Sequence, residues 1–390
     1  MLTLPPLSLY IHIPWCVQKC PYCDFNSHAL KEGVPEDQYV DALLTDLKQD
    51  AHYAQGRQIS SIFIGGGTPS LLSADAISRL LSGVRDLVPL QPDCEITLEA
   101  NPGTVESDKF TGFQQAGVNR ISIGVQSFQN EKLTALGRIH GKNEALRAIE
   151  QAQQAGLDSF NIDLMHGLPD QSLEDALSDL AQGIAMAPPH MSWYQLTIEP
   201  NTLFHSRPPT LPDDDILWDI YEQGHKVLQA AGYRQYEVSA YHRIDEHRAN
   251  ETNDYRCRHN LNYWRFGDYL GIGCGAHGKI TLPLQNQILR TSKIKHPRGY
   301  LAAKQQFVDQ QSFIANEDLP FEYFMNRFRL FEAFPISEYS ERTGQPLSSV
   351  EKTLADAEQQ GLLTIERQHL QLSLKGHRYL NSLLESFLAD

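Results

Sequence analysis

The sequence is short of basic residues, and this shortage limits the partners that it can bind. Its 390 residues include 33 lysines and arginines against 48 aspartates and glutamates, which gives a formal net charge of −15. Nucleic-acid binding depends on clustered positive side chains that neutralise phosphates. We therefore expect no nucleic-acid partner.

Long apolar runs are also absent. No uninterrupted run approaches the roughly 20 residues that a transmembrane helix needs. The N-terminal stretch MLTLPPLSLYIHIP lacks the basic segment that opens a secretory signal. We expect a cytoplasmic protein. Because disulfides are rare in that reducing compartment, clustered cysteines there indicate metal or redox chemistry.

The sequence does contain a regular alternation of two patterns. Short β-rich apolar runs alternate with longer segments of helical period, such as 37–54, 76–88 and 143–156. Strands that alternate with helices predict βαβ units and a parallel sheet. The six expected strands are 7–13, 60–66, 95–100, 120–126, 159–167 and 191–198.

Six such units fit an α/β protein with a partial, TIM-like (β/α)6 barrel over residues 1–210, in which functional groups follow the carboxyl ends of the strands. A doubly wound open sheet is the alternative. Residues 211–295 form an extension dense in His, Asn, Tyr and Arg, and we expect a functional loop region there. Residues 296–390 have the helix, helix and two-stranded order of a winged helix. Six acidic against four basic residues between 351 and 390 argue against DNA binding.

The stretch WCVQKCPYC places three cysteines, Cys16, Cys20 and Cys23, just after the first expected strand. Thiolates at this spacing can bind three irons of a cubane cluster and leave the fourth iron open to a substrate. Zinc is the alternative, with His12 or His28 as the fourth ligand, although zinc motifs usually contain paired C-x-x-C units.

Polar residues end several of the expected strands. Glu99, Gln126 and Asp163 end the third, fourth and fifth strands, so they would face one barrel mouth. The second strand ends in GGGTPS, where glycine lets the backbone approach a ligand closely. Arg138 could pair with a ligand carboxylate. Three scattered cysteines lack partners at metal spacing and are expected to be structural: Cys94, Cys257 and Cys274.

The cysteine spacing after a first strand resembles that of the radical S-adenosylmethionine (SAM) superfamily. The resemblance implies a [4Fe-4S] cluster on Cys16, Cys20 and Cys23, with SAM bound to the open iron. The motifs YIHIPWC, IGGGTPS, EANPG, GVQSF, LGRIH and NIDLMHGLP are similar to those of the oxygen-independent coproporphyrinogen III oxidase branch. Carried onto this sequence, they imply a SAM site lined by Tyr10, Tyr22, Gly66, Gly67, Thr68, Glu99, Gln126, Arg138 and Asp163.

Two departures separate the sequence from the oxidases of that branch. Those oxidases have a further cysteine where this sequence has Phe25, and they have a longer N-terminal extension. In both respects the sequence resembles the HemW-type heme chaperones. Their H-N-x-x-Y-W motif matches His259, Asn260, Tyr263 and Trp264. The resemblance implies heme with His259 as an axial ligand to its iron, and with Tyr263 and Trp264 as a flat apolar wall.

The preferred expectation is a heme chaperone that carries a [4Fe-4S] cluster and SAM. It would transfer heme to acceptor proteins such as respiratory heme enzymes at the membrane, with an electron donor as a further partner. No catalytic residue is assigned. The alternative is an oxidase that decarboxylates coproporphyrinogen propionates by radical chemistry begun on SAM, and a third reading is a radical enzyme for another tetrapyrrole. Heme propionates would meet Arg256 or Arg258 in the same loop.

Overall fold

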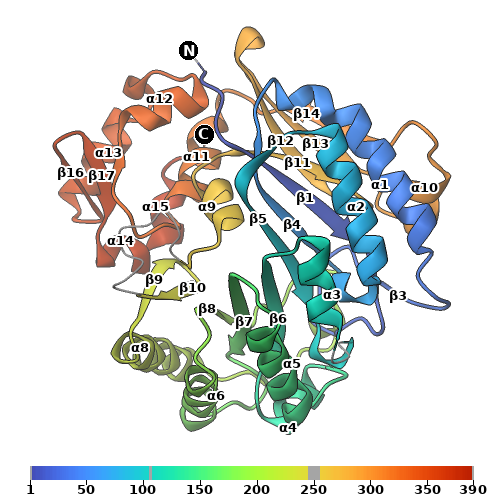
Figure 1. The fold of residues 1–390 in the computed structure, drawn as a ribbon. Helices are drawn as coiled ribbons and strands as arrows, with labels where there is room; N and C mark the ends of the chain where they lie inside the picture. Colours follow the sequence, from blue (N-terminus) through green and yellow to red (C-terminus); the bar gives the residue numbers. More distant parts are fainter. Residues whose placement is uncertain (1, 105–107, 245–254, 389–390) are drawn as a thin grey trace.

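A large twisted sheet organises the chain (Figure 1). The computed structural model describes residues 2–104, 108–244 and 255–388. The 12 strands of the large sheet follow the order β14-β13-β12-β11-β1-β4-β5-β6-β7-β8-β10-β9. The fifth to tenth strands in this order are parallel, and each pairs with the one that follows it in the sheet: β1 (Leu7–Ile13), β4 (Ile59–Gly66), β5 (Leu90–Ala100), β6 (Arg120–Gln126), β7 (Ser159–His166) and β8 (His190–Gln195).

This sequential order confirms the partial barrel. A doubly wound sheet would reverse its strand order at one point, and these six strands do not. Helices lie on the outer face of the sheet (Figure 1). They are α1 (Glu36–Asp50), α2 (Ala74–Leu87), α3 (Lys109–Ala116), α5 (Lys142–Gln154), α6 (Leu173–Ala185) and α8 (Asp214–Ala230). Two short helices, α4 (Asn130–Ala135) and α7 (Leu203–Ser206), lie at the carboxyl ends of the strands, where Phe204 of α7 packs beside Tyr22 of the cysteine loop.

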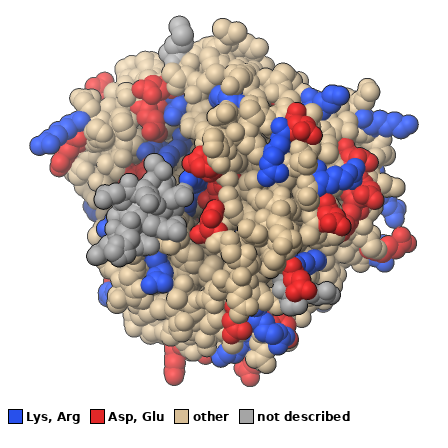
Figure 2. All heavy atoms as spheres, in the orientation of Figure 1, with Lys and Arg blue, Asp and Glu red and all other residues tan. Residues whose placement is uncertain are grey.

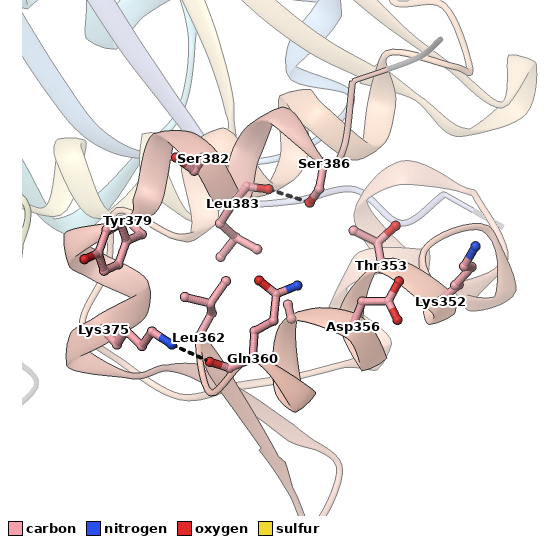
Figure 3. A pocket seen from close by; sticks show the side chains of 11 residues that line it. Lys352, Thr353, Asp356, Gln360, Leu362, Lys375, Tyr379, Ser382, Leu383 and Ser386 are labelled. Carbon is pink, nitrogen blue, oxygen red and sulfur yellow. Dashed lines mark hydrogen bonds between the residues drawn. The ribbon is translucent and has the colours of Figure 1, made fainter.

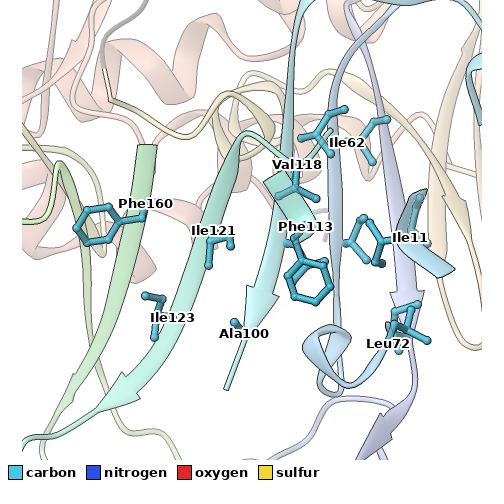
Figure 4. Packing of buried hydrophobic residues seen from close by; sticks show 14 of the residues in the cluster. Ile11, Ile62, Leu72, Ala100, Phe113, Val118, Ile121, Ile123 and Phe160 are labelled. Atoms are coloured by element: carbon cyan, nitrogen blue, oxygen red, sulfur yellow. The ribbon is translucent and has the colours of Figure 1, made fainter. Parts of the chain in front are cut away.

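Helix α2 shows how local sequence sets these elements. The Ser73 hydroxyl accepts a hydrogen bond from the Ala76 amide at 3.1 Å and caps the first turn. Apolar residues spaced by three or four positions then bury one face of the helix against the sheet. Figure 4 shows part of this outer core, where Phe113 of α3 lies close to strands that carry Ile62 and Ile121.

Side chains on the six parallel strands alternate between two environments. Apolar residues face the helices, for example Leu9 and Ile11 on β1 and Ile121 and Ile123 on β6. Polar residues at the intervening positions face the barrel interior. They include Ser8, Tyr10, His12, Ser61, Glu95, Glu99, Arg120, Ser122, Gln126, Asn161, Asp163, His190 and Ser192.

Strands that follow residue 210 extend both edges of the barrel. One edge carries β11 (Asp268–Ile272), β12 (His277–Leu282), β13 (Gln287–Lys293) and β14 (Val308–Phe313), and the other carries β10 (Ala240–Arg243) and β9 (Tyr233–Glu237). The short strands β2 (Trp15–Cys16) and β3 (His28–Ala29) form a separate pair, and α10 (Pro297–Ala302) follows β13.

The prediction of a functional loop around HNLNYW was wrong, because these residues form the helix α9 (Arg258–Trp264). Residues 245–254 of the predicted loop region lie outside the described residues. The helix depends on a distant partner, since the Glu95 carboxylate on β5 accepts hydrogen bonds from the amides of Arg258 and His259. Local sequence does not show that contact.

The predicted helix, helix and two-stranded wing are confirmed. Their elements are α12 (Ser337–Thr343), α13 (Glu351–Gln359), β16 (Leu363–Glu366) and β17 (His369–Leu372). The same region contains α11 (Leu319–Arg327), β15 (Phe334–Pro335), α14 (Leu374–Arg378) and α15 (Leu380–Glu385). A second apolar core joins these elements, and it includes Leu2 and Phe266. The boundary at 295 and 296 stays a prediction; β14 pairs with β13 of the main sheet.

Charged side chains of both signs are interspersed on the face in Figure 2. Among the described residues, no helix combines the length and the apolarity that crossing a membrane requires.

Buried ion pairs join the added strands to helix α1 of the barrel. The Lys293 ammonium on β13 lies 2.6 Å from Asp46 and 2.7 Å from Asp50, both on α1. We expect Lys293→Ala to lower the free energy of unfolding by roughly 3–5 kcal/mol, because it leaves two buried carboxylates without their cation. Urea denaturation measures this loss. Lys226→Ala is the matched control, since that lysine pairs with Glu222 on the surface; equal losses in both variants would contradict the prediction.

Candidate functional site

The carboxyl ends of the parallel strands open into a cavity of about 560 Å³. The cysteine loop after β1 forms one wall, and polar residues from β5, β6, β7 and β8 form others. A second hollow of about 530 Å³ lies between α13 and α15, lined by residues such as Lys352, Asp356 and Lys375 (Figure 3). Of these two cavities, as the described residues line them, the first brings cysteines and acidic side chains together, so it is the candidate site.

The structure brings the three cysteines of the loop to one cavity wall. The loop turns tightly, because the Cys23 amide donates to the Cys20 carbonyl at 3.1 Å. All three thiols are free, and the Arg138 guanidinium lies 3.7 Å from the Cys20 sulfur. Burial, followed by the neighbouring thiols, raises the pKa of Cys16. A bound metal cluster would offset this by holding the sulfurs as thiolates.

Neither histidine of the zinc alternative completes a zinc site. His12 uses both ring nitrogens, one with the Tyr10 hydroxyl at 3.0 Å and the other with the Asn26 carbonyl at 2.9 Å. His28 directs its Nε2 toward Asn26 and Lys295. Within the described ranges, no three His, Cys, Asp or Glu side chains are close enough to share one metal ion. A [4Fe-4S] cluster does not need that proximity, since each thiolate binds a different iron.

Two acidic side chains in the cavity lack a basic partner. Among the described residues, neither Glu99 nor Asp163 makes an ion pair; Glu99 accepts the Gly66 amide at 3.1 Å, and Asp163 accepts Ser122 and Asn161. Burial and the neighbouring Asp163 raise the pKa of Glu99 to about 8, and burial also raises the pKa of Asp163. Such a pair fits a cationic ligand, and SAM has a sulfonium and an ammonium group.

The glycines of the GGGTPS segment bring β4 against the cysteine loop. Gly66 has φ +115°, and a Cβ atom there would lie 2.5 Å from the His12 ring; one at Gly67 would lie 2.6 Å from the Trp15 carbonyl. Since His12 also holds Asn26 of the cysteine loop, a side chain at Gly66 would disturb that loop. Replacing Gly66 would therefore not separate SAM binding from cluster binding.

Gln126 ends β6 in a strained conformation, with φ +70°. Its side-chain oxygen accepts the Tyr194 hydroxyl at 2.9 Å, and Arg138 donates to the Gly124 carbonyl at 2.8 Å. Tyr194 and Ser192 also line the cavity, although no motif marks them. These two residues occupy alternate positions on β8, so their side chains point to the same face of the sheet, and this spacing could have identified them.

Eight of the nine predicted SAM residues line this cavity: Tyr22, Gly66, Gly67, Thr68, Glu99, Gln126, Arg138 and Asp163. The ninth, Tyr10, lies behind the wall and bonds to His12. The arrangement fits SAM, which supplies radical chemistry when a cluster reduces it. The residues of this chain would bind and orient it.

Helix α9 lies at the far end of the same cavity, where Asn260 and Trp264 line it. His259 is only 8% exposed; its Nδ1 lies 3.3 Å from the Ser61 hydroxyl, and its ring centre lies 5.1 Å from that of Phe63. Burial, with a smaller effect from Arg120, lowers the pKa of His259 to about 3, so the imidazole is neutral at pH 7. Tyr263 packs beside Tyr269.

Both arginines predicted to meet heme propionates contact protein carboxylates in this structure. Arg258 lies 2.8 Å from Asp93, and Arg256 lies 3.6 Å from Glu332. Two other charged residues, Glu237 and Arg329, line the cavity near α9. No sequence motif marked them.

Comparison with known proteins places this geometry in a family context. Residues 10–180 match the Radical SAM superfamily, and residues 314–379 match the HemN C-terminal domain. The chain is 62% identical over 390 residues to the heme chaperone HemW of Escherichia coli, covering 100% of both chains. It is 54% identical to the protein of the same name from Haemophilus influenzae, over 99% of both chains.

A solved structure shares the fold. The coproporphyrinogen III oxidase HemN of Escherichia coli, a radical SAM enzyme, superposes with a TM-score of 0.81 at 24% sequence identity, covering 98% of this chain and 90% of that one. At this identity the likeness concerns the fold alone.

The cysteine loop predicts a simple spectroscopic result. We expect Ala in place of Cys16, Cys20 or Cys23 to abolish the broad visible absorption of the anaerobically reconstituted protein, because each thiolate binds one iron. Cys94→Ala, at a buried cysteine outside the loop, should retain that absorption. Native protein purified without air that contains zinc and no iron would refute the cluster.

Glu99 gives a prediction on ligand binding and on pH. Its raised pKa means that the ligand-free folded protein binds a proton that the unfolded chain releases between pH 4.5 and about 8. Stability therefore falls as pH rises through this window. Glu99→Gln should reduce that fall in thermal denaturation, and calorimetry should find SAM affinity roughly 10-fold to 100-fold weaker, as for a lost charge-assisted hydrogen bond. Unchanged SAM affinity with an intact cluster would contradict the assignment.

Proposed function

Because this chain belongs to the HemW family of the radical SAM superfamily, we propose that it is a heme chaperone, which binds heme and transfers it to acceptor proteins. It would carry a [4Fe-4S] cluster and SAM at the carboxyl ends of the strands. Acceptors would include respiratory heme enzymes, and an electron donor would serve the cluster. All six cysteines are free, which fits work in the reducing cytoplasm.

The observation that carries this proposal is the position of α9. The helix bears the H-N-x-x-Y-W motif, and it lies at one end of the cavity whose other end holds the cysteine loop. One cavity thus offers a site for the cluster and SAM and a separate site for heme. Trp264 lines the cavity, so its aromatic ring can contact a porphyrin.

The state of His259 suits an axial ligand. A histidine binds metal through a neutral imidazole, and burial keeps this ring neutral. Its Nδ1 faces the Ser61 hydroxyl, and among described residues nothing bonds to its Nε2. A hydrogen bond at one nitrogen fixes the tautomer and leaves the other for the metal. The ring lies behind the cavity wall, so ligation also requires α9 or this side chain to move.

The oxidase alternative has weaker support. Coproporphyrinogen contains no iron, so an oxidase has no use for a histidine that ligates iron. Phe25 lies 64% exposed where the resemblance gives the oxidases a cysteine. The end-to-end identity of 62% to a heme chaperone also exceeds the 24% identity to the oxidase structure.

We expect His259→Ala to shift the Soret band of the heme complex and to weaken heme binding roughly 10-fold or more, since even residues that only orient a metal ligand contribute that much. Heme titration followed by absorbance measures both effects. Cluster absorption and SAM binding should persist, because the cysteine loop and strand ends lie at the opposite end of the cavity. His225→Ala, at a half-buried histidine on α8, is the control.

The wild-type protein decides between the two functions. Under anaerobic conditions with SAM and a reductant, a heme chaperone retains heme and releases no CO2 from coproporphyrinogen. Protein that binds no heme but releases CO2 would overturn the proposal and establish the oxidase.

A further inference from the structure

The α9 end of the cavity contains charged groups that neither motif nor family resemblance assigned. Glu237 ends β9, Trp264 ends α9, and Arg329 follows α11, so three distant parts of the chain meet at this point. We call this group the Arg329 end of the cavity. It lies opposite the cysteine loop and Arg138.

Among the described residues, no hydrogen bond holds the side chain of Arg329. The centre of its guanidinium lies 4.3 Å from the centre of the Trp264 ring, a cation–π contact. Of the carboxylates that the structure describes, only Glu237 lies within 4.0 Å of this guanidinium; its oxygen is 3.9 Å from the arginine Nη2, which is too far for a hydrogen bond. Arg265 differs from Arg329, since two of its nitrogens donate hydrogen bonds to the Glu332 carboxylate, at 2.8 and 2.7 Å.

Further donors at this end lack acceptors. In the part of the chain that the structure describes, Nε of Arg329 and Nε1 of Trp264 are both buried without a hydrogen-bond partner. A buried donor without an acceptor costs free energy, and an arginine fork matches the two oxygens of a carboxylate. As far as the described residues show, the site therefore has a cation and spare donors but no well-placed anion.

Glu237 does not fill this role well. Its side chain is almost fully buried, with 6% exposed, and burial, only partly offset by Arg329, raises its pKa to about 7. A carboxyl that is partly protonated at neutral pH is a weak partner for an arginine. A more acidic carboxylate that enters through the cavity can therefore replace Glu237 as the partner of Arg329.

We propose that Arg329, supported by the Trp264 ring, binds a propionate carboxylate of the tetrapyrrole that enters the cavity, and that Glu237 competes for the same guanidinium. The inference rests on the proposed function, because it takes heme as the ligand. Heme has two propionates on one edge of a flat apolar ring. The Arg329 end pairs a cation with an aromatic surface, which matches that edge.

Heme and heme dimethyl ester, in which both propionates are blocked, are the probes. The wild-type protein should bind heme roughly 10-fold or more tightly than the ester, as expected for a charge-assisted bidentate contact. Arg329→Gln should weaken heme binding to the level of the ester and leave ester binding unchanged. Glu237→Gln, which removes the competing charge, should strengthen heme binding severalfold and leave the ester unaffected.

Arg378→Gln is the matched control. The Arg378 guanidinium also lies over a tryptophan, 5.0 Å from the Trp218 ring centre, and its nearest carboxylate, on Glu222, is 4.0 Å away. It lies outside the cavity. This variant should bind both probes like the wild type.

Several outcomes would overturn the Arg329 site. Equal binding of heme and ester by the wild type would exclude a propionate contact while leaving the heme chaperone in place. If Arg329→Gln weakened the binding of heme and of the ester equally, the role of Arg329 would be structural. Weakened SAM binding with unchanged heme binding would assign the residue to SAM. If the wild type binds neither probe, the proposed function itself fails, and the Arg329 site fails with it.

Discussion

The polar interior of the barrel is the constraint on which the rest of the structure depends. Parallel strands covered on both faces are normally apolar on both, but here alternate residues place carboxylates, amides and hydroxyls inside. Each of these groups needs a partner. A buried chain of hydrogen bonds supplies several of them, from Asp163 through Asn161, His190 and Tyr236 to the Cys257 amide at the start of α9.

Helix α9 is a consequence of that constraint. The Glu95 carboxylate inside the barrel accepts two amides from the first turn of α9, and Asn262 donates to Ser8 on β1. The helix supplies hydrogen-bond partners to interior polar groups at the end opposite the cysteine loop. The Glu95 carboxylate in turn stabilises the first turn of the helix by accepting its free amides. The same polar interior therefore positions the carboxylates near the cysteines and the histidine of the H-N-x-x-Y-W motif.

The sequence allowed the barrel to be predicted because the signals were local. Four of the six expected strands match the structure to within one residue at each end, since their apolar runs and turn residues lie within the strands themselves. Helix α9 was missed because its capping partner, Glu95, lies 163 residues away from Arg258. Glu237 and Arg329 were missed for the same reason: only tertiary folding brings them beside Trp264.

The fold by itself does not decide between chaperone and oxidase, since one scaffold can host several functions. The oxidase structure shares this chain's architecture at a TM-score of 0.81 with only 24% identity, so the fold is compatible with both functions. The differences that matter must therefore lie in side chains along the cavity. Phe25 beside the cysteine loop and α9 at the opposite end are such positions. Under the proposed function, a ligand that contains iron would make use of His259, whereas a metal-free tetrapyrrole would not, and this chemical difference would separate the two functions on one barrel.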